Sequence, residues 1–211
     1  MRKLWISTCV LLLAACSSVP DGEKIDSIQP IDRAAYERHQ QLLVTKNSWR
    51  LQGQLALFNL RDDSRDAVYL DWSWTPDETA MRFSHPLRGT LATIEQTATG
   101  ALLIDDEQNE YRAPTIAALL TTYFGVRLPI DSLPTVVRGI LPRQAVAVEF
   151  MHPVQDSSTV VLASYEVNAE GQQWRANLAN YSAFESIYVP KNIELTAADW
   201  RIKLRINEWF L

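Results

Sequence analysis

Alternation of apolar and polar residues is the feature that most constrains the fold of this chain. Residues 49–57 alternate without interruption, and residues 68–74 place an apolar side chain at every second position. A period of two puts one set of side chains on a buried strand face and the other on a solvated face. Further strands are expected at 80–83, 91–96, 101–104, 110–113, 159–167, 172–179, 193–195 and 200–210. Closely spaced strands of this kind predict an antiparallel sheet that curls on itself.

Three segments have helical rather than strand spacing. Residues 32–44 predict a helix ahead of the strands, and residues 115–124 and 132–138 predict two more in the middle of the chain. With the apolar connector between them, the latter two form a strongly hydrophobic insert over residues 114–140. Two arrangements fit: the helices fill the concave face of the sheet as a solid core, or they cover an apolar cavity as a lid.

The N-terminus has the layout of a bacterial secretory signal. Arg2 and Lys3 precede an apolar run over residues 4–15, which is shorter than the roughly 20 residues that span a bilayer. Small residues then precede Cys16 and resemble a lipobox, so cleavage would leave Cys16 carrying N-acyl and S-diacylglycerol groups. A plain signal peptide with a coincidental cysteine, or a buried N-terminal helix, is the alternative. Ser17, where inner-membrane lipoproteins of this kind carry Asp, favours the outer membrane.

The chain is therefore expected to divide into a signal peptide (1–15), a lipidated flexible tether (16–30) and a single domain (31–211). A formal net charge of −5 argues against nucleic acid as a partner, because such binding depends on Lys and Arg contacts to phosphates. The basic residues that alternate along 200–210 are expected to be an ordinary solvated strand face.

Signatures of catalytic and metal sites are missing from the sequence. The seven glycines are never four apart, which excludes a Gly-x-Ser-x-Gly elbow, and none are close enough for a phosphate-binding loop. His39, His85 and His152 lack metal-ligand spacing. A lipid hydrolase would need a nucleophile arrangement that is not visible. We therefore expect no enzyme, no metal and no cofactor other than the acyl groups on Cys16.

Short segments, in order along the chain, match a known pattern. They are Ser84-His85-Pro86-Leu87, residues 118–120, 125–133 and 138–142, and residues 190–196 followed by 201–204. Together these segments resemble the LolB family of bacterial outer-membrane lipoprotein receptors, which is related to the periplasmic carrier LolA. The resemblance implies a mainly β fold: an unclosed antiparallel β-barrel, or half-barrel, with an α-helical lid over an apolar cavity that receives acyl chains.

The resemblance also implies a function and partners. A protein of this family would accept lipoproteins from a LolA-like carrier and insert them into the outer membrane, from a lipid-anchored position on the periplasmic face. The implied partners are the carrier, acylated lipoproteins as cargo and outer-membrane lipid, and a monomer is expected. The alternative is a structural or adaptor lipoprotein with a solid core and a protein partner.

Two groups of residues are candidates for the site. The cavity and lid candidates are Leu55, Leu57, Leu70, Trp72, Leu119, Leu120, Val136 and Val137. Which of them contact lipid and which only pack is left open. The second group is Pro86 and Leu87, in a turn between two expected strands: by itself Leu87 could fold back under its loop, whereas in the family the matching Leu protrudes and promotes membrane insertion. Arg88 stands where the family often has Gly, so it either reaches lipid headgroups or makes the insertion shallower.

Overall fold

A computed structural model describes residues 22–154 and 156–211, so the expectations about the signal peptide and Cys16 lie outside the described residues. Within these residues, twelve strands form one antiparallel sheet in the order β1-β8-β9-β10-β11-β12-β2-β3-β4-β5-β6-β7. Their bounds are β1 Glu23–Ile25, β2 Trp49–Asn59, β3 Ser64–Trp74, β4 Thr79–His85, β5 Gly89–Thr97, β6 Gly100–Asp105, β7 Glu110–Ala113, β8 Val146–His152, β9 Val161–Ala169, β10 Gln172–Phe184, β11 Ile187–Thr196 and β12 Trp200–Phe210. Because β1 and β7 end the order without pairing to each other, the sheet stays open, which confirms the expected unclosed barrel.

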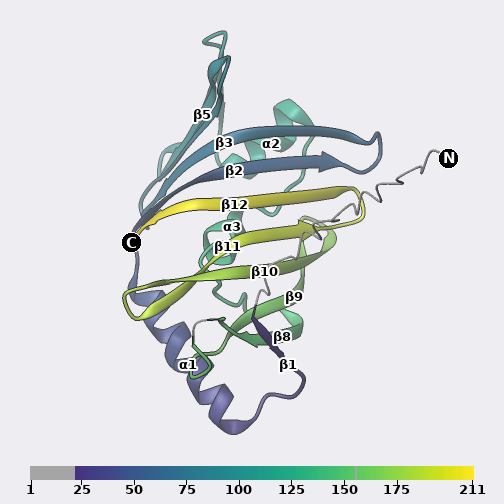
Figure 1. Ribbon diagram of the computed structural model, residues 1–211. Coiled ribbons are helices and arrows are strands. Elements are labelled where there is room, and N and C mark those ends of the chain that lie inside the picture. Colours follow the sequence, from purple (N-terminus) through teal and green to yellow (C-terminus); the bar gives the residue numbers. More distant parts are fainter. Residues whose placement is uncertain (1–21, 155) are drawn as a thin grey trace, which may run out of the picture.

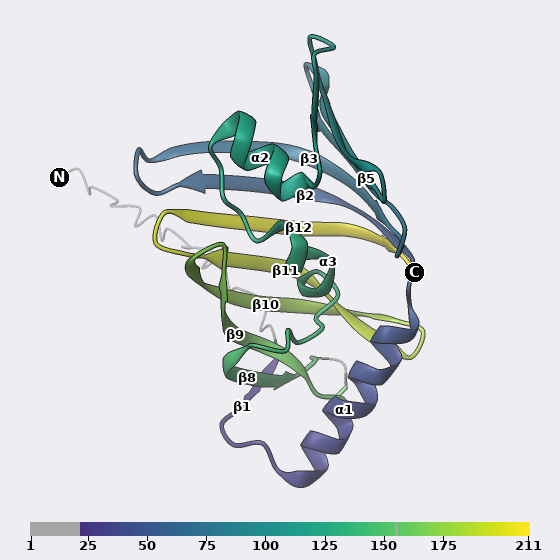
Figure 2. The ribbon, with the colours of Figure 1, turned by 180° about the vertical axis from the view of Figure 1, so that it is seen from behind.

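The sheet consists of two meanders that meet where β12 pairs with β2. Strands β2–β7 follow one another as neighbours, and so do β8–β12. The sheet is strongly curved, and β5 with its neighbours rises away from β2 and β3 (Figure 1). Seen from behind, α2 and α3 lie across one face of the sheet, in front of β2, β12 and β11 (Figure 2). No helix of the described residues covers the opposite face of the central strands.

The helices begin and end at residues that the sequence marks. Helix α1 (Pro30–Thr45) has Pro30 in its first turn and buries Ala35, His39 and Leu43, which are spaced four apart. In α2 (Ile116–Phe124) the hydroxyl of Thr115 accepts a hydrogen bond from Ala118 N at 3.1 Å. This helix ends at Gly125, whose φ of 67° is left-handed.

The second helix of the insert is shorter than expected. A 3-10 turn, η1 (Ile130–Ser132), leads into α3 (Leu133–Val136), where residues 132–138 were expected to be helical. Ser132 does not cap α3 as an N-cap side chain would. Its hydroxyl donates to Pro129 O at 2.8 Å instead.

Two strands lie where none was predicted. Strand β8 is irregular, because Ala147 has a φ of 50° and the pairing register to β9 shifts on either side of Glu149. Such bulges break the period of two. Strand β1 pairs with β8 at Lys24 and Met151, so the sheet begins inside the segment that was expected to be tether. Of the expected tether over residues 16–30, residues 16–21 lie outside the described residues, residues 23–25 form β1, and α1 already begins at Pro30.

Candidate functional site

An apolar cavity of about 250 Å³ lies between the sheet and the lid helices. Its lining residues are Leu55, Leu57, Leu70, Trp72, Met81, Phe83, Ala92, Ile94, Leu103, Ile116, Leu120, Leu128, Ile130, Leu133, Val137, Ile193, Leu195, Ile202 and Leu204. Every one of these side chains is apolar, apart from the indole N–H of Trp72, which donates to the Thr79 hydroxyl at 2.7 Å. Of the two arrangements that the sequence left open, the structure has the lid over a cavity rather than a solid core.

The structure brings most of the predicted cavity residues together. Six of the eight candidates line the cavity: Leu55, Leu57, Leu70, Trp72, Leu120 and Val137. The other two, Leu119 and Val136, belong to the lid helices and are buried, at 0% and 2% exposure, but they are not among the lining residues. They pack the lid onto the sheet rather than facing the cavity.

Further lining residues come from β4, β5 and β6 and were not singled out from the sequence. Phe83, Ile94 and Leu103 occupy alternating positions of strands that the period of two had predicted. The same alternation could have identified them. The connector adds Leu128 and Ile130, for which the sequence signal was only an apolar segment.

The residues that line the cavity differ in exposure. Leu70 and Trp72 are 5% and 2% exposed, whereas Leu55, Leu57 and Leu120 keep intermediate exposure. The volume lies below the roughly 300–1,000 Å³ of pockets that bury drug-sized ligands. A ligand with several long hydrocarbon chains therefore needs the lid to move.

Helix α2 is held to the sheet at both of its ends. Ile116 N donates to Gln96 Oε1 at 2.7 Å, and the Tyr123 hydroxyl donates to Arg112 O at 3.2 Å. Tyr111 of β7 packs against the rings of Tyr123 and Phe124, with centroids 5.2 and 5.6 Å away. The first half of the lid is thus fixed to β5 and β7.

The end of the lid is fixed by a buried cation. Arg138 is 9% exposed; its Nε donates to Pro134 O at 3.0 Å and its Nη1 to Lys46 O at 2.9 Å. The guanidinium lies 5.2 Å from the ring centroid of Trp74, and burial lowers the pKa of Arg138.

Gln40 of α1 also holds the end of the lid, through two hydrogen bonds. Its Nε2 donates to Gly139 O at 2.9 Å and its Oε1 accepts from Leu141 N at 3.2 Å. Between these two fixed ends, the backbone hydrogen bonds found for residues 126–132 stay within the lid. The connector is therefore the part of the lid that can move at the lowest cost.

The turn between β4 and β5 carries the most exposed of the large hydrophobic side chains that the structure describes. Leu87 is 91% exposed, and Pro86 is exposed beside it. Leu87 N donates to His85 Nδ1 and Arg88 N to His85 O, both at 3.2 Å, and Gly89 closes the turn with a φ of 75°. Leu87 therefore protrudes and does not fold back under its loop.

Arg88 points away from the tip of this turn. Its Nη2 lies 2.8 Å from Asp106 Oδ2, in the turn that follows β6. This contact holds the Leu87 turn against its neighbour and leaves the tip itself apolar.

Within residues 22–154 and 156–211, no group of three or more His, Cys, Asp or Glu side chains could hold a metal ion. In the same ranges, no helix combines the length and the apolar character that crossing a bilayer requires.

Comparisons with known proteins agree with this architecture. Residues 47–209 match the family model described as "Outer membrane lipoprotein LolB". The outer-membrane lipoprotein LolB of Psychromonas ingrahamii is 25% identical over 202 residues, which cover 96% of this chain and 92% of the relative. The protein of the same name from Tolumonas auensis is 23% identical over 218 residues, covering 100% and 97%.

Solved structures share the fold at low sequence identity. A LolA superfamily protein from Nitrosomonas europaea aligns with a TM-score of 0.51 at 10% identity, covering 85% of this chain and 93% of that one. At this identity the match speaks for the fold alone, a half-open sheet with few helices.

Proposed function

Because the chain belongs to the LolB family of outer-membrane lipoproteins, we propose that it accepts lipoproteins from a LolA-like periplasmic carrier and inserts them into the outer membrane. This is a lipoprotein-trafficking family rather than an enzyme family. The observation that carries the proposal is the all-apolar cavity under the lid, which can shield acyl chains. The same cavity argues against the alternative of an adaptor with a solid core.

The energetics of acyl chains explain why a partly open cavity suits a receptor. Burial of hydrocarbon is worth about 0.8 kcal/mol per CH₂, so the cargo cannot cross water with its chains exposed. A receptor must bind those chains better than the carrier does and less well than the bilayer. A cavity of about 250 Å³ with a solvent-accessible rim shields part of a triacylated cargo and leaves the bilayer as the better environment.

The proposed anchor keeps the domain close to the membrane. We propose that Cys16 carries the N-acyl and S-diacylglycerol groups. Only six residues, 17–22, separate Cys16 from the start of β1 at Glu23. Fully extended, six residues span about 20 Å. Such an anchor would keep the cavity and the Leu87 turn close to the acceptor membrane.

The proposal is tested with the full-length lipidated protein in vesicles and a carrier loaded with an acylated lipoprotein. Cargo should move from the carrier to the receptor and then to the bilayer. Ala92→Phe places a large side chain in the cavity lining and should slow uptake from the carrier about tenfold or more. The matched control is Ala34→Phe on the exposed side of α1, which should leave uptake unchanged. Equal uptake by both variants would contradict the proposal.

Leu87 is proposed to act at the membrane step. Burying one Leu side chain in the bilayer is worth ~1.5–3 kcal/mol, which biases how the turn meets lipid but does not anchor a protein. Leu87→Glu should leave transfer from the carrier largely intact and reduce delivery to vesicles tenfold or more. Ile31→Glu is the control, because Ile31 is 77% exposed on α1, away from this turn. Normal delivery by the Leu87→Glu variant would show that the turn is not a membrane wedge.

A further inference from the structure

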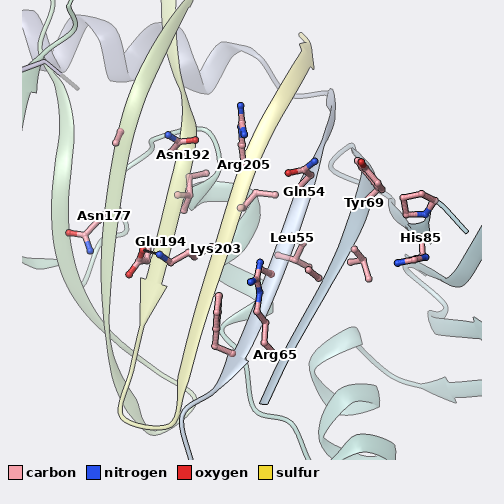
Figure 3. A pocket seen from close by; sticks show the side chains of 18 residues that line it. Gln54, Leu55, Arg65, Tyr69, His85, Asn177, Asn192, Glu194, Lys203 and Arg205 are labelled. Carbon is pink, nitrogen blue, oxygen red and sulfur yellow. Dashed lines mark ion pairs between the residues drawn. The ribbon is translucent and has the colours of Figure 1, made fainter. Parts of the chain in front are cut away.

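A second hollow, of about 670 Å³, lies on the face of the sheet opposite the lid (Figure 3). The polar side chains of β2 and β12, such as Gln54 and Arg205, line the hollow, whereas Leu57 and Ile202 of the same strands line the cavity under the lid. Leu55, Ile193 and Leu204 border both spaces. The hollow forms where the sheet forks. Pairing between β3 and β4 begins only at Tyr69 and Ser84, so the first part of β3 continues without β4 beside it.

The hollow is basic, although the chain as a whole is acidic. Arg65, Lys203 and Arg205 line it, and Glu194 is the one carboxylate among its described lining residues. Lys203 Nζ lies 2.9 Å from Glu194 Oε2, so these two charges offset each other. Arg65 and Arg205 form no ion pair with any residue in the described part of the chain. Among the described residues, two guanidinium groups without a carboxylate partner therefore lie exposed in a chain whose net charge is −5.

The ring of Phe58 lies against two of the basic side chains on this face. The guanidinium carbon of Arg65 lies 5.2 Å from the ring centroid of Phe58, and that of Arg201 lies 4.5 Å from the same ring. Phe58 is only partly buried, and two cations on its ring would repel each other without a counter-charge. An anion between or beside them would relieve that repulsion.

The hollow is continuous with the Leu87 turn. His85 and Pro86 belong to this turn and also line the hollow, and His85 lies beside Tyr69 at its margin (Figure 3). The protruding Leu87 thus follows directly after two residues of a basic surface. An apolar tip beside Lys and Arg side chains is the combination by which proteins bind at lipid headgroups.

We propose that this hollow binds the phosphate groups of phospholipid headgroups in the acceptor membrane and so sets the orientation in which Leu87 enters the bilayer. The inference rests on the proposed function, which it deepens by giving the receptor a defined contact with lipid. Guanidinium groups suit phosphate because their planar donors match its oxygens in pairs. The hollow faces away from the lid, so cargo uptake and headgroup binding use different faces of the sheet.

The test places a polarity-sensitive fluorophore on Leu87→Cys in the full-length lipidated protein, held in vesicles. Vesicles of phosphatidylethanolamine with phosphatidylglycerol are compared with vesicles of phosphatidylethanolamine and phosphatidylcholine. Each Arg near an anionic surface favours binding about fivefold. Removing both charges with Arg65→Gln and Arg205→Gln should therefore lower the ratio of buried to exposed fluorophore at least tenfold in the anionic vesicles. The effect should shrink at 1 M salt, where the Debye length is about 3 Å.

The matched control removes the same charge elsewhere. Arg33 and Arg38 are exposed on α1, which lies near the β8 and β9 end of the sheet (Figure 1), and Arg33→Gln with Arg38→Gln should leave the fluorophore signal unchanged. Equal effects from both pairs, or no effect from either, would overturn the inference. It is also overturned if inorganic phosphate at constant ionic strength changes the signal while lipid composition does not.

Transfer from the carrier is measured on the same samples, which separates the two proposals. Normal transfer by the Arg65→Gln, Arg205→Gln variant with an unchanged fluorophore signal overturns only the headgroup site. Reduced transfer with an unchanged signal would assign the hollow to a protein partner and also overturns it. Failure of the unsubstituted protein to accept cargo overturns the proposed function itself.

Discussion

One part of the sheet is filled by its own side chains, whereas another encloses a cavity. In β9 and β10, Tyr165 and Trp174 are fully buried, and the Tyr181 hydroxyl donates to Leu162 O at 2.8 Å inside the core. Across β2–β6 the inward side chains are mostly Leu, Ile and Ala, and the lid stands over them without filling the space. In β10 buried and exposed residues alternate, whereas residues 161–165 of β9 are all buried, so the filled region has core on both faces of that strand. The two regions therefore differ in side-chain size and in what covers the sheet.

The comparison shows where stability is given up for function. At about 24 cal/mol per Å³, a cavity of about 250 Å³ forgoes roughly 6 kcal/mol of packing. That is a large part of the ~5–15 kcal/mol by which domains are stable. The filled region must therefore supply much of the stability that the hollow region lacks, which leads to unequal responses to mutation.

The largest effect is expected in the filled region. Trp174 is 0% exposed on β10, and Trp174→Ala should lower the free energy of unfolding by about 3–5 kcal/mol, because the site cannot collapse around the lost indole. Urea unfolding followed by circular dichroism measures this. A loss below about 1 kcal/mol would mean that the two regions are equally tolerant and that the comparison fails.

A pH effect of somewhat smaller size should arise where α1 joins β11. Burial lowers the pKa of His39 to about 4, and its Nε2 accepts a hydrogen bond from Tyr188 N at 3.0 Å, which requires that nitrogen to be unprotonated. The unfolded chain binds the proton near pH 6.5. The contribution of neutral His39 is thus fully present above pH 6.5 and is lost as the pH falls towards 4, by up to roughly 3 kcal/mol.

His39→Gln checks the assignment, because an amide oxygen can accept the same hydrogen bond without titrating. The unfolding free energy of this variant should depend less on pH between 6.5 and 4 than that of the unsubstituted chain. Parallel pH profiles would show that another group is responsible.

The sequence predicts the regular strands better than the irregular ones, for a physical reason. Alternation located β2 because every residue of that strand keeps its register with β3. Strand β8 was not predicted because its bulges interrupt the alternation of apolar and polar residues. Strand β1 was not predicted because three residues are too few to show such an alternation. Where a strand's regularity depends on its partner, the local pattern cannot reveal it.

The candidate site was also predicted only in part. Apolar character identified the lid, but Leu119 and Leu120 are neighbours on one helix, and only Leu120 lines the cavity. The difference is set by the rotation of α2 on the sheet, which is fixed by the hydrogen bonds that α2 donates to Gln96 Oε1 and to Arg112 O. The basic side chains of β12 were predicted to form an ordinary solvated face. The hollow on this face could not be predicted, because it depends on where β3 and β4 separate, and that is set by tertiary pairing.

An acyl ligand should act on the hollow region and leave the filled one unchanged. A fluorescent fatty acid at 100 times its dissociation constant should raise the free energy of unfolding by about 2.7 kcal/mol. Ala92→Phe should abolish most of this increment, whereas Trp174→Ala should lower the baseline but keep the increment. Saturable binding that persists in the Ala92→Phe variant would place the ligand outside the cavity.

The smallest effect is expected for a truncation at the cavity rim. Leu57 is only partly buried and already borders empty space, so Leu57→Ala removes few contacts and creates little new cavity. We expect a loss of ~1 kcal/mol or less in unfolding free energy. The matched truncation Leu162→Ala, at a side chain 0% exposed in the filled region, should cost about 3 kcal/mol or more. Denaturant midpoints of the two variants, measured side by side, decide the point. Equal losses would mean that the lid packs on Leu57 as tightly as the core packs on Leu162. The space beside Leu57 would then be filled by side chains and would have no room for an acyl chain.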